Sequence, residues 1–142
     1  QIQNASNTDG TKPFTNEYFP STAAEGDNNS AIYMTRKVTL DNASTALKVI
    51  FDAILFSTSY IDVYQKTLRS DDTTQFEDIA WTQMTIDKTV TESKNYTDFR
   101  EYTYEATNLD SYIAFAVKIV MRGTNTSKPP LIKDFRAISL AL

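Results

Sequence analysis

Apolar and polar residues alternate with a period of two over most of the chain after residue 31, and no sustained helical period competes with this pattern. The clearest case is residues 112–122, where every second residue is apolar: Ile113, Phe115, Val117, Ile119 and Met121. Successive side chains of a β-strand point to opposite faces, so the pattern predicts a strand with one buried face. Lys118 and Arg122 fall on the other face and are predicted to point to solvent.

Other segments follow the same rule. The predicted strands are residues 32–40, 46–56, 60–66, 86–90, 99–106, 112–122 and 131–142. Residues 46–56 are apolar on both faces, which predicts a central strand covered on both sides. Ser57-Thr58-Ser59 offers a tight reversal that would join this strand to residues 60–66 as a hairpin. About seven or eight such strands predict an all-β, antiparallel β-sandwich of jelly-roll type.

Local signals refine this prediction at three places. Residues 41–44 (DNAS) have the composition of a turn. A short helical turn is expected near residues 76–79 or 109–112. The phase of the last strand shifts between Ile132 and Phe135, which predicts a β-bulge.

The first 30 residues differ from the rest of the chain. They are polar and show neither the period of a strand nor that of a helix. We therefore interpret residues 1–30 as an extended N-terminal arm or linker and residues 31–142 as the β-sandwich domain. The first residue is Gln1 rather than Met, which suggests a processed product or a piece of a longer polypeptide.

Composition narrows the possible functions. The chain has no Cys and no His, which removes disulfides, thiolate metal sites and a Ser-His-Asp triad. Its net charge of −4 disfavours binding to nucleic acid, which requires a basic surface. No apolar run is long enough to span a membrane. We therefore expect no nucleic-acid partner, no membrane association and no cofactor.

The carboxylates do not suggest catalysis or a metal site. Glu101 and Glu105 share a predicted strand face about 13 Å apart, beyond the separation used by glycosidases. Asp71-Asp72 and residues 25–29 (EGDNN) could supply oxygen ligands to calcium, but neither has the spacing of a calcium loop. We therefore predict no enzyme activity and no metal ion, and we interpret these carboxylates as solvated charges.

Exposed aromatic rings are the remaining candidates for a binding surface. Tyr60 and Tyr64 fall on the face opposite Ile61 and Val63, and Trp81 and Tyr96 are two further candidates. Such rings can stack on a sugar or form the centre of a protein interface. A single Trp in an apolar context, as in Ile79-Ala80-Trp81, is more often part of a core.

Two further sets of surface residues are interpreted without a functional site. A basic patch is expected near the C-terminal strands as a solvated outer face, formed by Lys118, Arg122, Lys128, Lys133 and Arg136. Glycosylation sequences occur in predicted turns or in the arm, and we attribute them to chance: Asn4, Asn28, Asn42, Asn95 and Asn125.

Three stretches together carry a resemblance: residues 31–40 (AIYMTRKVTL), residues 46–65 (ALKVIFDAILFSTSYIDVYQ) and residues 99–142 with the closing phrase KPPLIKDFRAISL. This order resembles β-sandwich domains in structural proteins of contractile-tailed marine bacteriophages, such as baseplate, neck or tail-fibre components. Discoidin-like and carbohydrate-binding sandwiches have a similar strand order and a similar Pro-x-Ile closing strand.

The resemblance implies a jelly-roll or discoidin-like sandwich that acts as a noncatalytic structural and adhesive module of a phage virion. Its partners would be other virion proteins or copies of itself, oligomeric in the assembled particle. The alternative is a carbohydrate-binding module that uses Tyr60, Tyr64, Trp81 and Tyr96. The resemblance transfers no catalytic residue.

Overall fold

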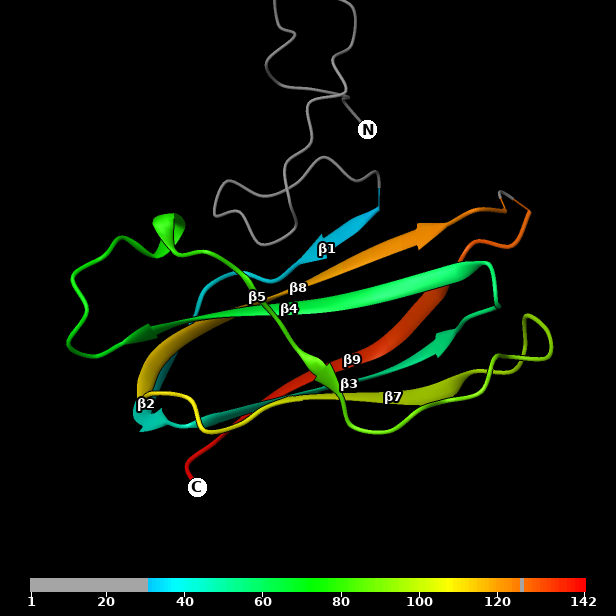
Figure 1. Ribbon diagram of the computed structural model, residues 1–142. Coiled ribbons are helices and arrows are strands. Elements are labelled where there is room, and N and C mark those ends of the chain that lie inside the picture. Colours follow the sequence, from blue (N-terminus) through cyan, green and yellow to red (C-terminus); the bar gives the residue numbers. More distant parts are fainter. Residues whose placement is uncertain (1–30, 126) are drawn as a thin grey trace, which may run out of the picture.

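Two antiparallel sheets form the part of the chain that the computed structural model describes, residues 31–125 and 127–142 (Figure 1). The first sheet consists of β1 (Ile32–Met34), β2 (Val38–Ser44), β4 (Ser59–Arg69), β5 (Thr82–Gln83) and β8 (Tyr112–Gly123). Its order is β1-β8-β4-β5, and β2 also pairs with β8. The second sheet has the order β6-β7-β3-β9 and consists of β3 (Ala46–Ile54), β6 (Thr85–Ile86), β7 (Arg100–Ala106) and β9 (Leu131–Leu140). The predicted all-β sandwich is therefore confirmed, whereas the predicted arm at residues 1–30 lies outside the described residues.

The main core lies between the two sheets and follows the period of two. In β8, the side chains of Phe115, Val117 and Ile119 are buried as predicted. On the facing sheet, Phe51 of β3 stacks on Tyr102 and Tyr104 of β7, with ring centroids 5.9 and 5.7 Å apart. Each large apolar side chain buried in this way contributes about 1.5–3 kcal/mol before the entropy cost of folding. This inter-sheet core holds the sandwich together.

The hairpin predicted for residues 46–66 is wrong. The tight reversal exists, because the Ser59 N–H donates to the Phe56 carbonyl at 2.9 Å. However, β3 pairs with β7 and β9, whereas β4 pairs with β5 and β8, so the chain crosses from one sheet to the other at this turn. Alternation shows which side chains face inward but does not define the partner strand. Two strands that face each other across the core have the same pattern as two neighbours.

The predicted strand at residues 32–40 is divided into β1 and β2, which both pair with β8. Thr35 connects them: its N–H donates to the Val117 carbonyl, and its hydroxyl accepts from the Val117 N–H, both at 2.9 Å. The turn predicted at residues 41–44 is also wrong, because β2 continues to Ser44 and the chain bends at Thr45. Polar residues typical of turns are tolerated here because β2 lies at the rim of its sheet and is mostly exposed.

The predicted bulge in the last strand is confirmed. Ile50 pairs with Arg136 and Asp52 pairs with Lys133, so two residues of β9 oppose the single residue Phe51. One of the two, Asp134, has a φ of 54°, in the left-handed region that Asp and Asn tolerate better than most residues. The extra residue restores the inward direction of Phe135 after the shift in phase.

A second apolar cluster covers the outer face of the first sheet. The chain between β4 and β5 contains the predicted helical turn, the 3-10 helix η1 (Phe76–Asp78), and crosses in front of β4 and β8 in Figure 1. We call this group the outer cluster; its buried members are Tyr64, Phe76, Trp81, Ala114, Ala116 and Val120. The outer face of β3, in contrast, is only partly covered, with Lys48, Ile50 and Asp52 half-buried, so the prediction of cover on both sides is wrong there.

Candidate functional site

The four aromatic residues predicted to form a binding surface do not lie on one exposed face. Tyr64 and Trp81 are buried in the outer cluster, with only 7% and 3% of their surface exposed. Tyr60 is 49% exposed and packs beside the Arg122 guanidinium, 5.7 Å from the ring centroid. Tyr96 is 40% exposed, but its hydroxyl donates to the Pro129 carbonyl at 2.9 Å and so ties two loops together. The sequence showed the strand face of Tyr64 correctly but not that a loop covers it.

The two buried rings, Tyr64 and Trp81, lie beside two lysines. Lys118 is fully buried, and its ammonium lies 5.2 Å from the Tyr64 ring and 5.0 Å from the Trp81 ring. The ammonium of Lys66 lies 4.8 Å from Trp81 and 4.7 Å from Phe76. Burial lowers the pKa of Lys66, and the nearby Lys118 lowers it further, whereas Glu77 opposes both effects. The prediction that Lys118 faces solvent is therefore wrong.

The predicted basic patch is dispersed. Arg122 is ion-paired with Asp62 on the first sheet, whereas Arg136 lies 3.6 Å from Glu101 on the second. Lys128 and Lys133 lie over the rings of Phe56 and Phe99, at 5.2 and 4.1 Å. Together with the burial of Lys118, this leaves no single basic surface among these five residues.

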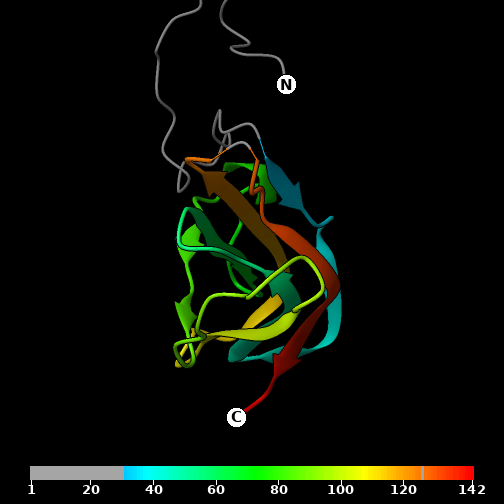
Figure 2. The ribbon, with the colours of Figure 1, turned by 90° about the vertical axis from the view of Figure 1, so that its right-hand side faces the viewer.

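β1, β2 and β9 lie next to one another along one side of the sandwich (Figure 2), and β1 and β9 carry the exposed apolar residues Tyr33 and Leu131. Tyr33 of β1 contacts Phe135 of β9 edge-to-face, with ring centroids 5.5 Å apart. Beside this contact runs a groove of about 430 Å³ between the two sheets. We call it the β1–β9 groove; its lining residues include Tyr33, Ile119, Met121, Leu131, Ile132 and Phe135.

Three other apolar residues on these edge strands are exposed: Met34 on β1, Val38 on β2 and Ile138 on β9, by 49%, 39% and 41%. Met34 pairs with Lys118 and Ile138 pairs with Lys48, so these two side chains lie on the outer faces of the two sheets and not in the groove. Lys133 and Asp134 provide opposite charges at the rim of the groove. This surface has no signal in the sequence, because it arises where distant edge strands meet and not from one continuous segment.

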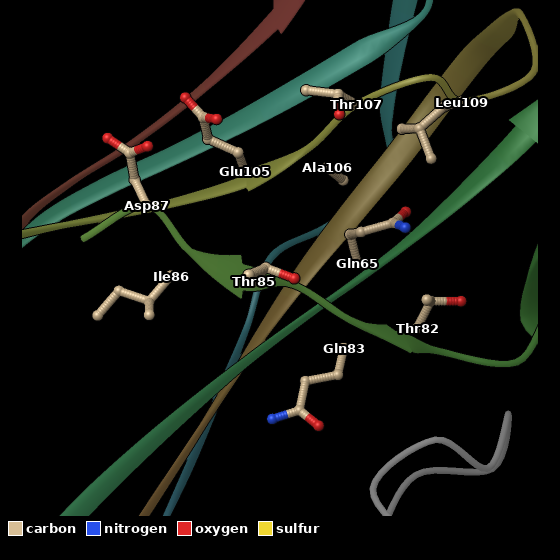
Figure 3. A pocket seen from close by; sticks show the side chains of 10 residues that line it. All are labelled: Gln65, Thr82, Gln83, Thr85, Ile86, Asp87, Glu105, Ala106, Thr107 and Leu109. Carbon is tan, nitrogen blue, oxygen red and sulfur yellow. The ribbon is translucent and has the colours of Figure 1, made fainter. Parts of the chain in front are cut away.

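A second, polar hollow lies on the opposite side of the sandwich, where the chain passes from β5 to β6. We call it the β5–β7 cleft; it has a volume of about 560 Å³ (Figure 3). Its lining residues are Gln65, Thr82, Gln83, Thr85, Ile86, Asp87, Glu105, Ala106, Thr107 and Leu109. Gln65 was also missed by the sequence analysis, although a signal was available: it has the same strand phase as the buried Ile61 and Val63.

The carboxylates examined as catalytic candidates lie in ordinary surface environments. Glu105 pairs with Lys48 at 3.1 Å, and Glu101 lies near Arg136. The Asp72 carboxylate accepts a hydrogen bond from the Thr74 N–H at 2.9 Å, and bonds to Thr74 lower the pKa of Asp72. No group of three or more acidic residues placed to hold a metal ion occurs among residues 31–125 and 127–142, and residues 25–29 lie outside them.

Two of the glycosylation sequences form the same local structure. The side-chain carbonyl of Asn95 accepts hydrogen bonds from the Thr97 N–H and hydroxyl, and that of Asn125 accepts from the Ser127 N–H and hydroxyl. Such turns explain these Asn residues as loop-forming elements.

Comparison with known proteins returns no matching family model, no matching curated protein and no matching solved structure. Within the described part of the chain, no helix has the length and apolarity to cross a membrane.

Proposed function

We propose that this domain is a noncatalytic structural module that associates with neighbouring protein chains through its β1–β9 groove. The observation that carries the proposal is the apolar lining of this groove, in which Tyr33 and Leu131 are 48% and 41% exposed. Contiguous exposed apolar surface of this kind is typical of protein–protein contact sites.

The partner that fits best is a second copy of this chain. Lys133 and Asp134 place a positive and a negative side chain next to each other at the rim of an apolar groove. Such a surface can be self-complementary, since a two-fold axis that passes between the two side chains sets Lys133 of one copy against Asp134 of the other. A stable contact would bury roughly 800 Å² on each copy.

The setting that we propose is the tail, baseplate or neck of a phage particle, with a jelly-roll or discoidin-like form of the sandwich. This finer part of the proposal rests on the motifs at residues 31–40, 46–65 and 99–142. The alternative of sugar stacking on Tyr60, Tyr64, Trp81 and Tyr96 loses its support, because two of these rings are buried.

Sedimentation velocity of the purified chain over about 5 to 500 μM tests the association, since this range covers weak and moderate homodimers. We expect reversible dimerisation that Leu131→Asp abolishes, because the substitution places a charge in the groove. Tyr60→Asp is the matched control, since Tyr60 is exposed to a similar degree on another face. A chain that is monomeric throughout, or equal loss with both variants, would contradict the proposed groove contact. Cross-linking mass spectrometry of purified virions that contain this chain tests the phage setting.

A further inference from the structure

The β5–β7 cleft contains a buried polar group without a partner. Gln65 is only 4% exposed, and no hydrogen bond to its side-chain oxygen Oε1 occurs within the described residues. Buried carbonyl oxygens almost always accept a hydrogen bond. Gln65 is one of the residues that line the cleft (Figure 3), so a ligand there would lie beside its carboxamide, and a rotation of the side chain would bring Oε1 to a donor on the ligand.

The other lining groups define the chemistry of a ligand. Thr82, Thr85 and Thr107 supply hydroxyls, which both donate and accept, and Asp87 and Glu105 supply carboxylates. In Figure 3 the two carboxylates lie side by side toward one end, and Thr107 and Leu109 lie toward the other. The lining contains no Lys or Arg; Lys48 outside the lining pairs with Glu105, but the Asp87 carboxylate would still repel an anionic ligand.

Two lining side chains are already held in place. Glu105 pairs with Lys48 at 3.1 Å, and Gln83 donates to the Asp62 carboxylate at 3.3 Å. Ile86, Ala106 and Leu109 add an apolar strip between the polar groups. A cleft of about 560 Å³ with such a mixed lining has the size of ordinary small-molecule sites.

From these contacts we propose that the β5–β7 cleft binds a neutral polyhydroxylated ligand, a saccharide unit being the chemical class that fits. Each hydroxyl of a sugar donates and accepts, which matches a lining of hydroxyls, carboxamides and carboxylates. One of them would donate to Gln65, and the C–H surface of the ring would lie against the apolar strip. An ammonium compound fits less well because it cannot accept from the threonine hydroxyls. The cleft is separate from the β1–β9 groove, so this proposal does not depend on self-association.

Nuclear magnetic resonance titration of the ¹⁵N-labelled chain with glucose, galactose and N-acetylglucosamine, each to about 50 mM, tests the proposal, because this range reveals millimolar binding. We expect at least one neutral sugar to shift the amide signals of Gln65, Thr82 and Thr107 in a saturable manner. Glucuronate, which carries a carboxylate, should bind at least about tenfold more weakly. If no neutral sugar produces a saturable shift, the cleft holds only water and the proposal is wrong.

Substitutions at the cleft distinguish a loss of ligand binding from a loss of folding. Gln65→Met retains the shape of the side chain and removes the acceptor, so we expect binding at least about tenfold weaker. Gln75→Met is the matched control, since Gln75 is exposed outside the cleft. If Gln65→Met does not fold, Asp87→Asn, at an exposed residue of the lining, should weaken binding about threefold or more, whereas Asp41→Asn should not. Unchanged affinity in the cleft variants would overturn the proposal, and Leu131→Asp should leave sugar binding intact.

Discussion

The inter-sheet core and the outer cluster cover opposite faces of the first sheet in different ways. The inter-sheet core is built by two sheets that supply alternate residues, and its polar atoms are mainly tyrosine hydroxyls. The outer cluster is built by one sheet face and a loop, and it encloses two ammonium groups among aromatic rings. Strand periodicity therefore accounts for the inter-sheet core, whereas the outer cluster depends on where the loop between β4 and β5 packs.

The inter-sheet core should be the less tolerant of charge. Phe115→Asp places a carboxylate between the sheets, where Phe115 is 4% exposed, and we expect the domain to lose more than about 4 kcal/mol and to unfold. Circular dichroism and urea denaturation measure the effect. A folded Phe115→Asp variant would show that β8 does not bury this face.

An acidic residue should also destabilise the outer cluster. Lys118→Asp replaces a fully buried cation beside Tyr64 and Trp81 with a buried anion, and we expect a loss of about 4 kcal/mol in the free energy of unfolding. The control is Lys88→Asp at an exposed position, where the change should stay within about 0.5 kcal/mol. Equal effects in urea denaturation would mean that Lys118 faces solvent after all.

Loss of the Trp81 ring should destabilise the outer cluster without unfolding the sandwich. Trp81→Ala should cost about 3 kcal/mol, because the loop around η1 loses its largest contact with β4 and β8. In hydrogen exchange, amides at residues 70–84 should open well before those of β3 and β7. Uniform acceleration across both sheets would contradict this separation of the two regions.

Raising the pH should change the contributions of the two regions to folding stability in opposite directions. Burial raises the pKa of Tyr104 and Tyr112 to about 12, so the unfolded chain releases these protons first and stability falls as the pH rises from 10 to 12. The pKa of Lys66 is lowered, so its contribution rises with pH in the window below 10.5. Urea denaturation at pH 9 and 11.5 should show a net loss, which Tyr104→Phe reduces by about 2 kcal/mol. An unchanged slope in that variant would argue against burial of Tyr104.

The sequence defined the faces of the strands better than their partners. Alternation placed Phe115, Val117 and Ile119 on the buried face and located the bulge between Ile132 and Phe135, because a buried face constrains every second residue. It failed at residues 46–66, since a crossing between sheets and a hairpin have the same pattern. It failed at Lys118 because no local signal shows that a distant loop will cover an outer face.

The candidate sites were the least predictable. The four aromatic residues were chosen by type, but exposure depends on contacts between distant elements, and two of the four are buried. The β1–β9 groove joins residues from opposite ends of the domain, so no sequence window contains it. Gln65 could have been recognised as a polar residue in a core-facing position of β4.

The pairing order has a consequence for how the chain acquires its structure. β8 lies between β1 and β4, and β3 lies between β7 and β9, so each sheet is completed only by strands near the end of the sequence. A nascent polypeptide cannot close either layer until β8 and β9 have emerged, and loop closure over such separations makes folding slow. Products truncated before β8 should remain open to proteolysis, which makes synthesis of residues 112–140 the step that commits the chain to its native form.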